Sequence, residues 1–188
     1  MSTREHLTPS EVVAQVVSKI RPYDQLEQDH ILETLDWIRS GAPIFRQRKP
    51  DIPPKHLCSY VLLYDETAQK VLLMNHKLSQ LWLPAGGHVE QDEHPTKTAK
   101  RECREELGME PIFWKDEPVF LTSTITVGLT PGHNDVNFWY VVRGSTEAPL
   151  HFDSKEFEEF RWFSFSEIPF ERSDQHMKRF VAKLRSLG

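Results

Sequence analysis

The sequence has few cysteines, no long hydrophobic run and no excess of positive charge. Its two cysteines, Cys58 and Cys103, are too few for a disulfide framework and lack the spacing of metal ligands. No apolar stretch approaches the roughly 20 residues that a membrane-spanning helix needs. The opening residues, MSTREHLTPSEVV, contain no apolar segment of the signal-peptide kind. We therefore expect a reduced, cytoplasmic protein with no membrane partner.

Acidic residues outnumber basic ones. The chain has 28 Asp and Glu against 23 Lys and Arg, which gives a formal net charge of −5 with histidine neutral. A protein with this balance has no global attraction for nucleic acid or for an anionic membrane. We therefore expect no nucleic-acid partner. A polyanionic ligand would need a local group of basic side chains or a bound cation.

The length and apolar content suit one domain with a small appendage. The chain has 188 residues, of which 38% are hydrophobic. Residues 1–45 predict a helical hairpin, interrupted at Pro22, and residues 46–188 form the main domain. The hairpin has three interpretations. It packs on the main domain, which we favour, or it is the arm of a homodimer, or it is a lid over a site.

The main domain alternates between strand and helix patterns. Short apolar runs predict strands at residues 57–64, 70–74, 119–127, 135–142 and 160–163. Helices are predicted at residues 95–107 and 173–187. Strands mixed with helices in a chain of this length indicate an α/β (α+β) fold with a mixed β-sheet and helices on both faces.

Three carboxylates are crowded on one face of the helix predicted at 95–107. With 3.6 residues per turn, Glu102, Glu105 and Glu106 fall within one arc of about 100°. Like charges at this spacing repel one another, and a divalent cation would relieve the repulsion. Carboxylate oxygens favour Mg²⁺ or Mn²⁺ over zinc. A solvated acidic helix face is the alternative.

The spacing of the surrounding residues decides between these interpretations. The order is Gly87, five residues, Glu93, seven residues, then Arg101-Glu102-Cys103-x-Glu105-Glu106-x-Gly108-Met109. This segment resembles the Nudix box of the Nudix hydrolase superfamily, whose pattern is G-x5-E-x7-R-E-U-x-E-E-x-G-U with U bulky and apolar. Every fixed letter matches. Cys103 occupies a U position, which is usually Ile, Leu or Val. The departure is mild, because a buried cysteine behaves as a small hydrophobic residue.

The resemblance covers about residues 57–187 and implies a Nudix-type α/β/α sandwich. It also implies hydrolysis of the P–O–P bridge in a nucleoside diphosphate linked to another group, with Mg²⁺, or Mn²⁺, as cofactor. The metal ligands implied are the carboxylates of Glu102, Glu105 and Glu106 and the carbonyl oxygen of Gly86. Glu93 and Arg101 are expected to fix the loop and the helix in place.

The family often adds a distant glutamate before an Arg-Trp-Phe-like strand, and Arg161-Trp162-Phe163 offers that setting here. Glu156 is our first candidate for a further metal ligand and catalytic group, and Glu159 is the second. A solvated acidic loop is the alternative for both. Glu102 and the distant glutamate are the two candidates for the general base.

Substrate contacts are expected on the sheet beside the metals. Asn137 and Trp139 share one face of a predicted strand and could hydrogen-bond and stack a nucleobase. His76, Lys77 and Trp82 precede the glycine pair and could reach a phosphate or a base. We favour the alternatives that Trp139 fills the core and that Lys77 is merely solvated.

The resemblance implies hydrolysis of a small-molecule nucleotide. Thr124 stands where ADP-sugar hydrolases of the family tend to carry proline, and residues 125–127 lack the tyrosine typical of dinucleoside polyphosphate hydrolases. Elimination leaves a nucleoside triphosphate or a modified nucleotide. The alternative is a Nudix-fold nucleotide sensor. An isopentenyl diphosphate isomerase is disfavoured, because neither cysteine has the setting of a catalytic thiol.

Overall fold

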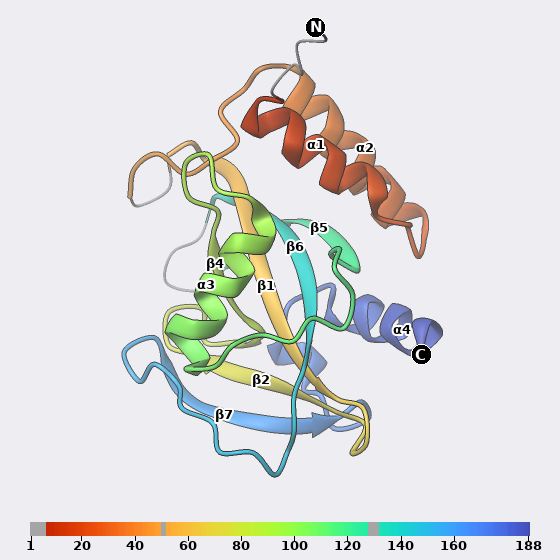
Figure 1. The fold of residues 1–188 in the computed structure, drawn as a ribbon, viewed down its shortest axis with the longest axis vertical. Coiled ribbons are helices and arrows are strands. Elements are labelled where there is room, and N and C mark those ends of the chain that lie inside the picture. The colour runs from red at the N-terminus through yellow and green to blue at the C-terminus, as the bar shows by residue number, and fades with distance from the viewer. Residues whose placement is uncertain (1–6, 50–51, 128–131) are drawn as a thin grey trace, which may run out of the picture.

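A seven-stranded mixed sheet forms the centre of the molecule. The computed structural model describes residues 7–49, 52–127 and 132–188. The strands are β1 (Lys55–Asp65), β2 (Lys70–His76), β3 (Trp82–Leu83), β4 (Ala85–His88), β5 (Phe120–Ile125), β6 (Asn134–Arg143) and β7 (Phe157–Ser164). The main order is β3-β2-β1-β6-β5, while β4 pairs with β1 and β7 pairs with β2. Figure 1 shows β1 running through the centre of the molecule.

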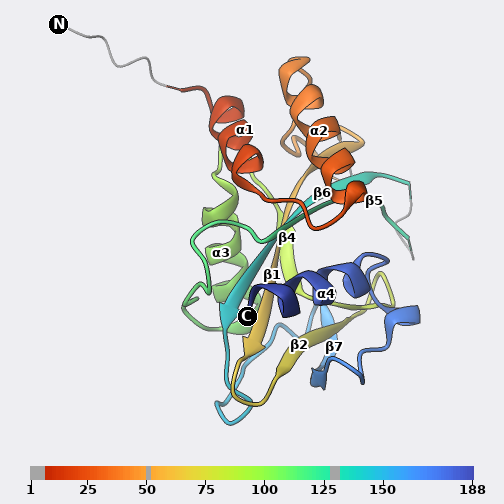
Figure 2. The same cartoon turned by 90° about the vertical axis from the view of Figure 1, so that its right-hand side faces the viewer.

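Two helices cover opposite faces of this sheet. They are α3 (Pro95–Leu107) and α4 (Met177–Leu187). Ala99, Cys103 and Leu107 of α3 belong to one hydrophobic cluster. Phe180 of α4 belongs to another, where its ring stacks on Trp139 with centroids 4.7 Å apart. Figure 2 shows α3 and α4 on either side of the central strands, which confirms the predicted α/β/α sandwich.

The predicted strands all form, but the boundaries of some elements differ from the prediction. The helix predicted from residue 173 begins at Met177, because the Asp174 carboxylate accepts a hydrogen bond from the His176 backbone N–H and forms a turn there. The short strands β3 and β4 were not predicted, since Pro84 and two glycines make that segment look like a loop. Among the described residues, no helix combines the length and hydropathy that crossing a bilayer requires.

The N-terminal hairpin consists of α1 (Pro9–Lys19) and α2 (Gln25–Arg39). Thr8 and Glu11 form a capping box at the start of α1, and Asp24 caps α2. The apolar faces of both helices join the hydrophobic cluster that α3 shares with the sheet. The hairpin therefore packs on the main domain, at the end of the sheet where β5 and β6 lie (Figure 1).

Two side chains of α2 also contact the backbone of β5. Glu27 Oε1 accepts a hydrogen bond of 3.2 Å from the Leu121 N–H, and His30 Nδ1 accepts one of 3.4 Å from the Ser123 N–H. These two donors are two residues apart, so they point to the same side of the strand.

A buried ion pair joins the hairpin to α4. Lys183 Nζ lies 2.7 Å and 3.0 Å from the two carboxylate oxygens of Glu27, and the residues are 5% and 0% exposed. Burial raises the pKa of Glu27 and lowers the pKa of Lys183. The Tyr23 N–H also donates to Glu27, and Lys183 also donates to the Arg21 carbonyl. The charges are thus paired and hydrogen-bonded, as burial requires.

Lys183→Met is expected to lower the free energy of unfolding by about 3–5 kcal/mol, because it leaves the Glu27 carboxylate buried and unpaired. Chemical denaturation of both proteins measures the loss. Adding Glu27→Gln should recover part of it, since the amide oxygen can still accept the Leu121 N–H without a charge. A loss below about 1 kcal/mol for the single variant would contradict this role.

A second ion pair, between Asp24 and Arg179, makes the same connection nearer the surface. Arg179 Nε donates to Asp24 Oδ2 at 2.7 Å, and this contact lowers the pKa of Asp24 from 3.8 to about 2. A carboxyl whose pKa is depressed in the folded state contributes stability above its unfolded value of 3.8. That contribution is lost as the pH falls through about 2.

Asp24→Asn is expected to keep the helix cap but to remove the charge of this pair. At pH 7 the variant should be less stable by about 1 kcal/mol, since the pair is partly solvated. The difference between wild type and variant should shrink below pH 3.8 and vanish as the pH falls below about 2. Denaturation of both proteins across this range tests the sign, and a difference that grows on acidification would refute it.

Candidate active site

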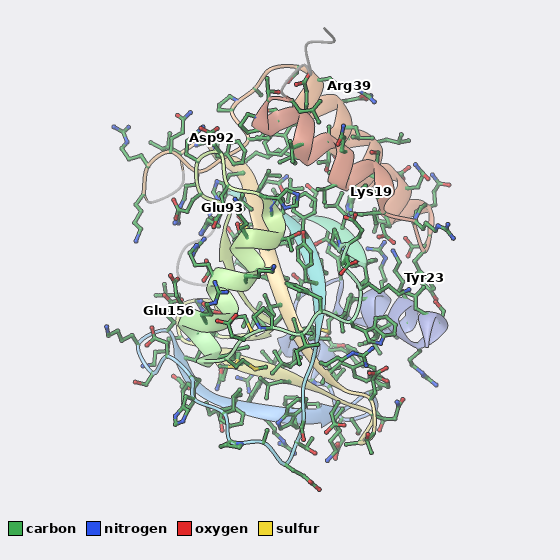
Figure 3. All side chains as sticks on the ribbon, viewed as in Figure 1. Lys19, Tyr23, Arg39, Asp92, Glu93 and Glu156 are labelled. Carbon is green, nitrogen blue, oxygen red and sulfur yellow. The ribbon has the colours of Figure 1, made fainter. Side chains whose placement is uncertain are left out.

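Arg101 connects the parts of the motif predicted to bind metal. One guanidinium nitrogen, Nη2, donates to Glu93 Oε2 and to the His88 carbonyl, both at 3.1 Å. The other, Nη1, lies 2.6 Å from Glu102 Oε1 and 3.3 Å from Glu105 Oε2. Figure 3 shows Glu93 on the loop that leads into α3. Arg101 therefore joins that loop to the helix, with one planar group contacting three carboxylates.

The three glutamates of α3 differ in exposure. Glu102 and Glu106 are 7% and 5% exposed, whereas the Glu105 side chain is largely exposed. Burial raises the pKa of Glu106 to about 9, and the nearby Glu102 and Glu156 carboxylates add to that shift. Burial also raises the pKa of Glu102, although Arg101 opposes the change. The positive charge of Arg101 alone therefore does not compensate the negative charge of the buried carboxylates in this site.

The two glycines before α3 are required by close contacts. Gly86 has φ +150°, and a Cβ there would collide with the Ser59 carbonyl oxygen of β1. Its N–H donates to Glu106 Oε2 at 2.7 Å. A Cβ on Gly87 would collide with Glu102 Oε1. Glycine at position 86 thus lets β4 lie close against β1, and glycine at position 87 lets it approach the Glu102 carboxylate.

The structure separates the two candidates for the distant glutamate. Glu156 lies on the segment before β7 (Figure 3) and lines the same cleft as Glu102 and Glu106. Its carboxylate is close enough to raise the pKa of Glu106. Glu159 is exposed and does not line the cleft, and one of its oxygens lies 3.5 Å from Asn75 Nδ2. The geometry favours Glu156.

A cleft of about 1270 Å³ lies over these carboxylates. This exceeds the roughly 300–1,000 Å³ of common small-molecule pockets, so a nucleotide has room. Residues predicted to contact metal or substrate that line it are His76, Lys77, Gly86, Arg101, Glu102, Glu105, Glu106, Asn137 and Glu156. No residue of α1 or α2 is among the described residues that line the cleft, so a lid role for the hairpin has no support.

Three predicted substrate contacts lie in the cleft. Lys77 donates from Nζ to the Ser154 carbonyl at 2.6 Å, and its backbone N–H donates to the Glu156 carbonyl at 3.0 Å. Burial lowers the pKa of His76, so this imidazole is neutral at pH 7. Asn137 is 1% exposed, and within the described residues its Oδ1 has no hydrogen-bond partner. Asn137 therefore has an acceptor available for a ligand.

Trp82 and Trp139 lie in the core and not in the cleft. Trp139 is fully buried, and its Nε1 donates to Thr122 Oγ1 at 2.9 Å. Trp82 packs edge-on against Phe163 with centroids 5.1 Å apart. Alternation puts Asn137 and Trp139 on one face of β6, but α4 covers that face at Trp139. The possible substrate contacts of Trp82 and Trp139 are therefore corrected to core packing, which for Trp139 is the alternative that we favoured.

A group of histidines that no sequence pattern indicated lies at the cleft, with His88, His133 and Asp135 among its lining residues. His56, His88, His133 and Asp135 each offer one ligand atom, and these atoms all lie within 4.8 Å of one another. Burial lowers the pKa of His88 to about 3. Burial alone would raise the pKa of Asp135, but the imidazoles of His133 and His56 hold it well below its usual value. Strand register brings these residues together, because His56 pairs with Asp135 across β1 and β6.

Comparisons with known structures agree with this architecture. A hydrolase of the NUDIX family from Clostridium perfringens is 20% identical with a TM-score of 0.55, covering 71% of this chain and 98% of its own. The E. coli dihydroneopterin triphosphate pyrophosphohydrolase is 16% identical with a TM-score of 0.54, covering 74% and 99%. A C. elegans Ap4A hydrolase is 15% identical with a TM-score of 0.52, covering 69% and 96%. These identities show a shared fold.

The comparison with family models gives a more specific result. The NUDIX domain model matches residues 54–184, which is most of the chain and leaves the N-terminal hairpin outside. A search of curated proteins returned no match to this sequence. The domain match confirms the enzyme class expected from the motif, a hydrolase of pyrophosphate bonds. The chain belongs to the NUDIX family.

Proposed function

We propose that this protein is a Mg²⁺-dependent pyrophosphohydrolase that cleaves a nucleoside triphosphate or a modified nucleotide. One observation carries the proposal. Glu156 meets Glu102 and Glu106 of α3 at one cleft, where burial and mutual repulsion raise the pKa of Glu106 to about 9. Such an arrangement is unfavourable without a cation, and perturbed carboxylates in a cleft are typical of functional sites.

The donor atoms fit a hard divalent cation. The proposed ligands are the carboxylates of Glu102, Glu105, Glu106 and Glu156 and the carbonyl oxygen of Gly86. Oxygen donors of this kind suit Mg²⁺, and Mn²⁺ as a substitute. When bound, the cation would neutralise phosphate charge and lower the pKa of the attacking water.

The protein's own residues would position the substrate and the carboxylates. Arg101 donates hydrogen bonds to the Glu102 carboxylate and to the His88 carbonyl of β4, and so fixes the position of α3 relative to β4. Lys77 supplies a positive charge at the cleft beside Glu156 and would bind a phosphate oxygen. The Asn137 Oδ1 would accept a hydrogen bond from the substrate. Glu102 and Glu156 are the two candidates for the group that takes a proton from water.

A polyphosphate substrate is supported by the size of the cleft and by two structural neighbours, whose names specify dihydroneopterin triphosphate and Ap4A. The choice of a nucleoside triphosphate or a modified nucleotide within this class rests on residues 124–127. We also propose a cytoplasmic location and a small-molecule substrate without a nucleic-acid partner, in line with the net charge of −5. The hairpin buries its apolar face against its own chain, so we do not propose that it is a dimer arm.

Glu106→Gln is expected to lower kcat at least about 100-fold, because it removes a charged ligand worth several kcal/mol of transition-state stabilisation. The fold should survive, since the amide oxygen can still accept the Gly86 N–H. Chromatography of products from a panel of nucleoside triphosphates, nucleotide sugars and dinucleotides with Mg²⁺ measures the effect. Circular dichroism of both proteins provides the folding control.

Two results would contradict the proposal. Unimpaired turnover by Glu106→Gln would refute the assignment of this carboxylate as a ligand. Nucleotide binding by the wild type without Mg²⁺-dependent cleavage of any compound in the panel would refute hydrolysis and favour a sensor.

Glu156→Gln and Glu159→Gln form a matched pair that tests the distant carboxylate. Glu156→Gln is expected to lower kcat about 10-fold or more, because this group lies with Glu102 and Glu106 in the cleft. Glu159→Gln is expected to stay within about twofold of wild type, because its carboxylate lies outside the cleft and makes only a surface contact. Steady-state kinetics at saturating Mg²⁺ measures both, and the reverse order would refute the choice of Glu156.

A further inference from the structure

The histidine group beside the cleft contains polar atoms that the fold leaves unsatisfied. His56 is fully buried, and its Nε2 makes no hydrogen bond within the described residues. The same holds for Asp135 Oδ1, although the two atoms are only 3.1 Å apart. Buried polar atoms without partners are uncommon and call for an explanation.

The position of the ring proton on His56 makes its contact with Asp135 unfavourable. Its Nδ1 lies 2.8 Å from the Pro53 carbonyl oxygen, which can only accept, so Nδ1 carries the proton. In the neutral ring Nε2 is then a bare lone pair, and it faces a carboxylate oxygen. Two acceptors at this distance repel each other unless a proton or a metal cation lies between them, and a metal cation can also be shared with the other two imidazoles. A histidine that donates one ring N–H to a backbone carbonyl is also the usual state of a metal ligand.

Two distances within the group match those between neighbouring ligands of a tetrahedral metal ion. His56 Nε2 and His133 Nε2 lie 3.1 Å and 3.3 Å from Asp135 Oδ1. Bonds of about 2.0–2.1 Å to a tetrahedral Zn²⁺ would separate neighbouring ligand atoms by about 3.3 Å. The widest pair in the group is at most 4.8 Å apart, so the side chains would need to close by roughly 1–1.5 Å.

We propose that His56, His88, His133 and Asp135 form a structural Zn²⁺ site, separate from the carboxylate site for Mg²⁺. Three imidazoles and one carboxylate suit zinc, whereas the glutamates of α3 suit a hard cation. Four protein ligands complete a closed tetrahedral site. The ion would fasten β1, the end of β4 and the start of β6 to one another beside the cleft.

Among the described residues, Arg46 opposes a cation at this site. Its Nη1 lies 3.5 Å from His88 Nε2, at the limit of a hydrogen bond. The guanidinium competes for His88 and repels a positive ion. Removing its charge should therefore strengthen zinc binding, an effect opposite in sign to the loss of a ligand.

Titration of the metal-free full-length protein with Zn²⁺ against a chromophoric chelator tests the proposal. The wild type is expected to bind one Zn²⁺ with an affinity that Asp135→Asn and His88→Gln each weaken by at least about 100-fold, more than loss of an outer-sphere partner costs. Arg46→Gln should bind more tightly than the wild type. Replacement of Zn²⁺ by Co²⁺ should give the intense visible absorption of tetrahedral cobalt.

Two matched controls separate this site from other ligands. His151→Ala removes an exposed histidine and should leave zinc affinity unchanged. Glu106→Gln alters the carboxylate site and should also leave it unchanged, so the result does not depend on the proposed hydrolysis. Circular dichroism checks the fold of each variant. Equal zinc affinity for wild type and Asp135→Asn, or loss of tight binding in Glu106→Gln alone, would overturn the proposal.

Discussion

The position of β1 in the sheet determines where every other part of the site lies. This strand pairs antiparallel with β4 and parallel with β6. The first pairing places the glycine pair at the base of α3, and the second places Asn137 and Asp135 beside it. Cys58 of β1 is the common partner, because it pairs with His88 on one side and Asn137 on the other. The glycine pair beside the α3 carboxylates and the cleft-lining residues of β6 therefore meet on either side of one strand.

Electrostatic crowding then follows from the packing. The carboxylates of α3 point toward a backbone that only glycine allows to come so close, and this approach buries Glu102 and Glu106. A single arginine serves as the organising cation for three carboxylates, and Glu156 adds another acidic group to the cleft. An acidic protein thereby presents a concentrated negative site, which under the proposed function a divalent cation would convert into a site for polyphosphate.

The sequence predicted the parts that depend on local spacing. Helical periodicity placed Glu102, Glu105 and Glu106 together, and the predicted helix 95–107 has the observed bounds. The contacts that failed depend on partners distant in the chain. Trp139 shares a strand face with Asn137, but α4 covers only one of them. The histidine group needs the register of β1 against β6, which no local pattern contains.

The hairpin has a consequence for the exposed side of the sheet. β5 ends the strand order, and an edge strand with unpaired N–H groups can recruit another chain. Glu27 and His30 of α2 accept the outward N–H groups of Leu121 and Ser123, so part of this edge is already occupied from within the molecule. The N-terminal extension thus also protects the protein against edge-to-edge aggregation.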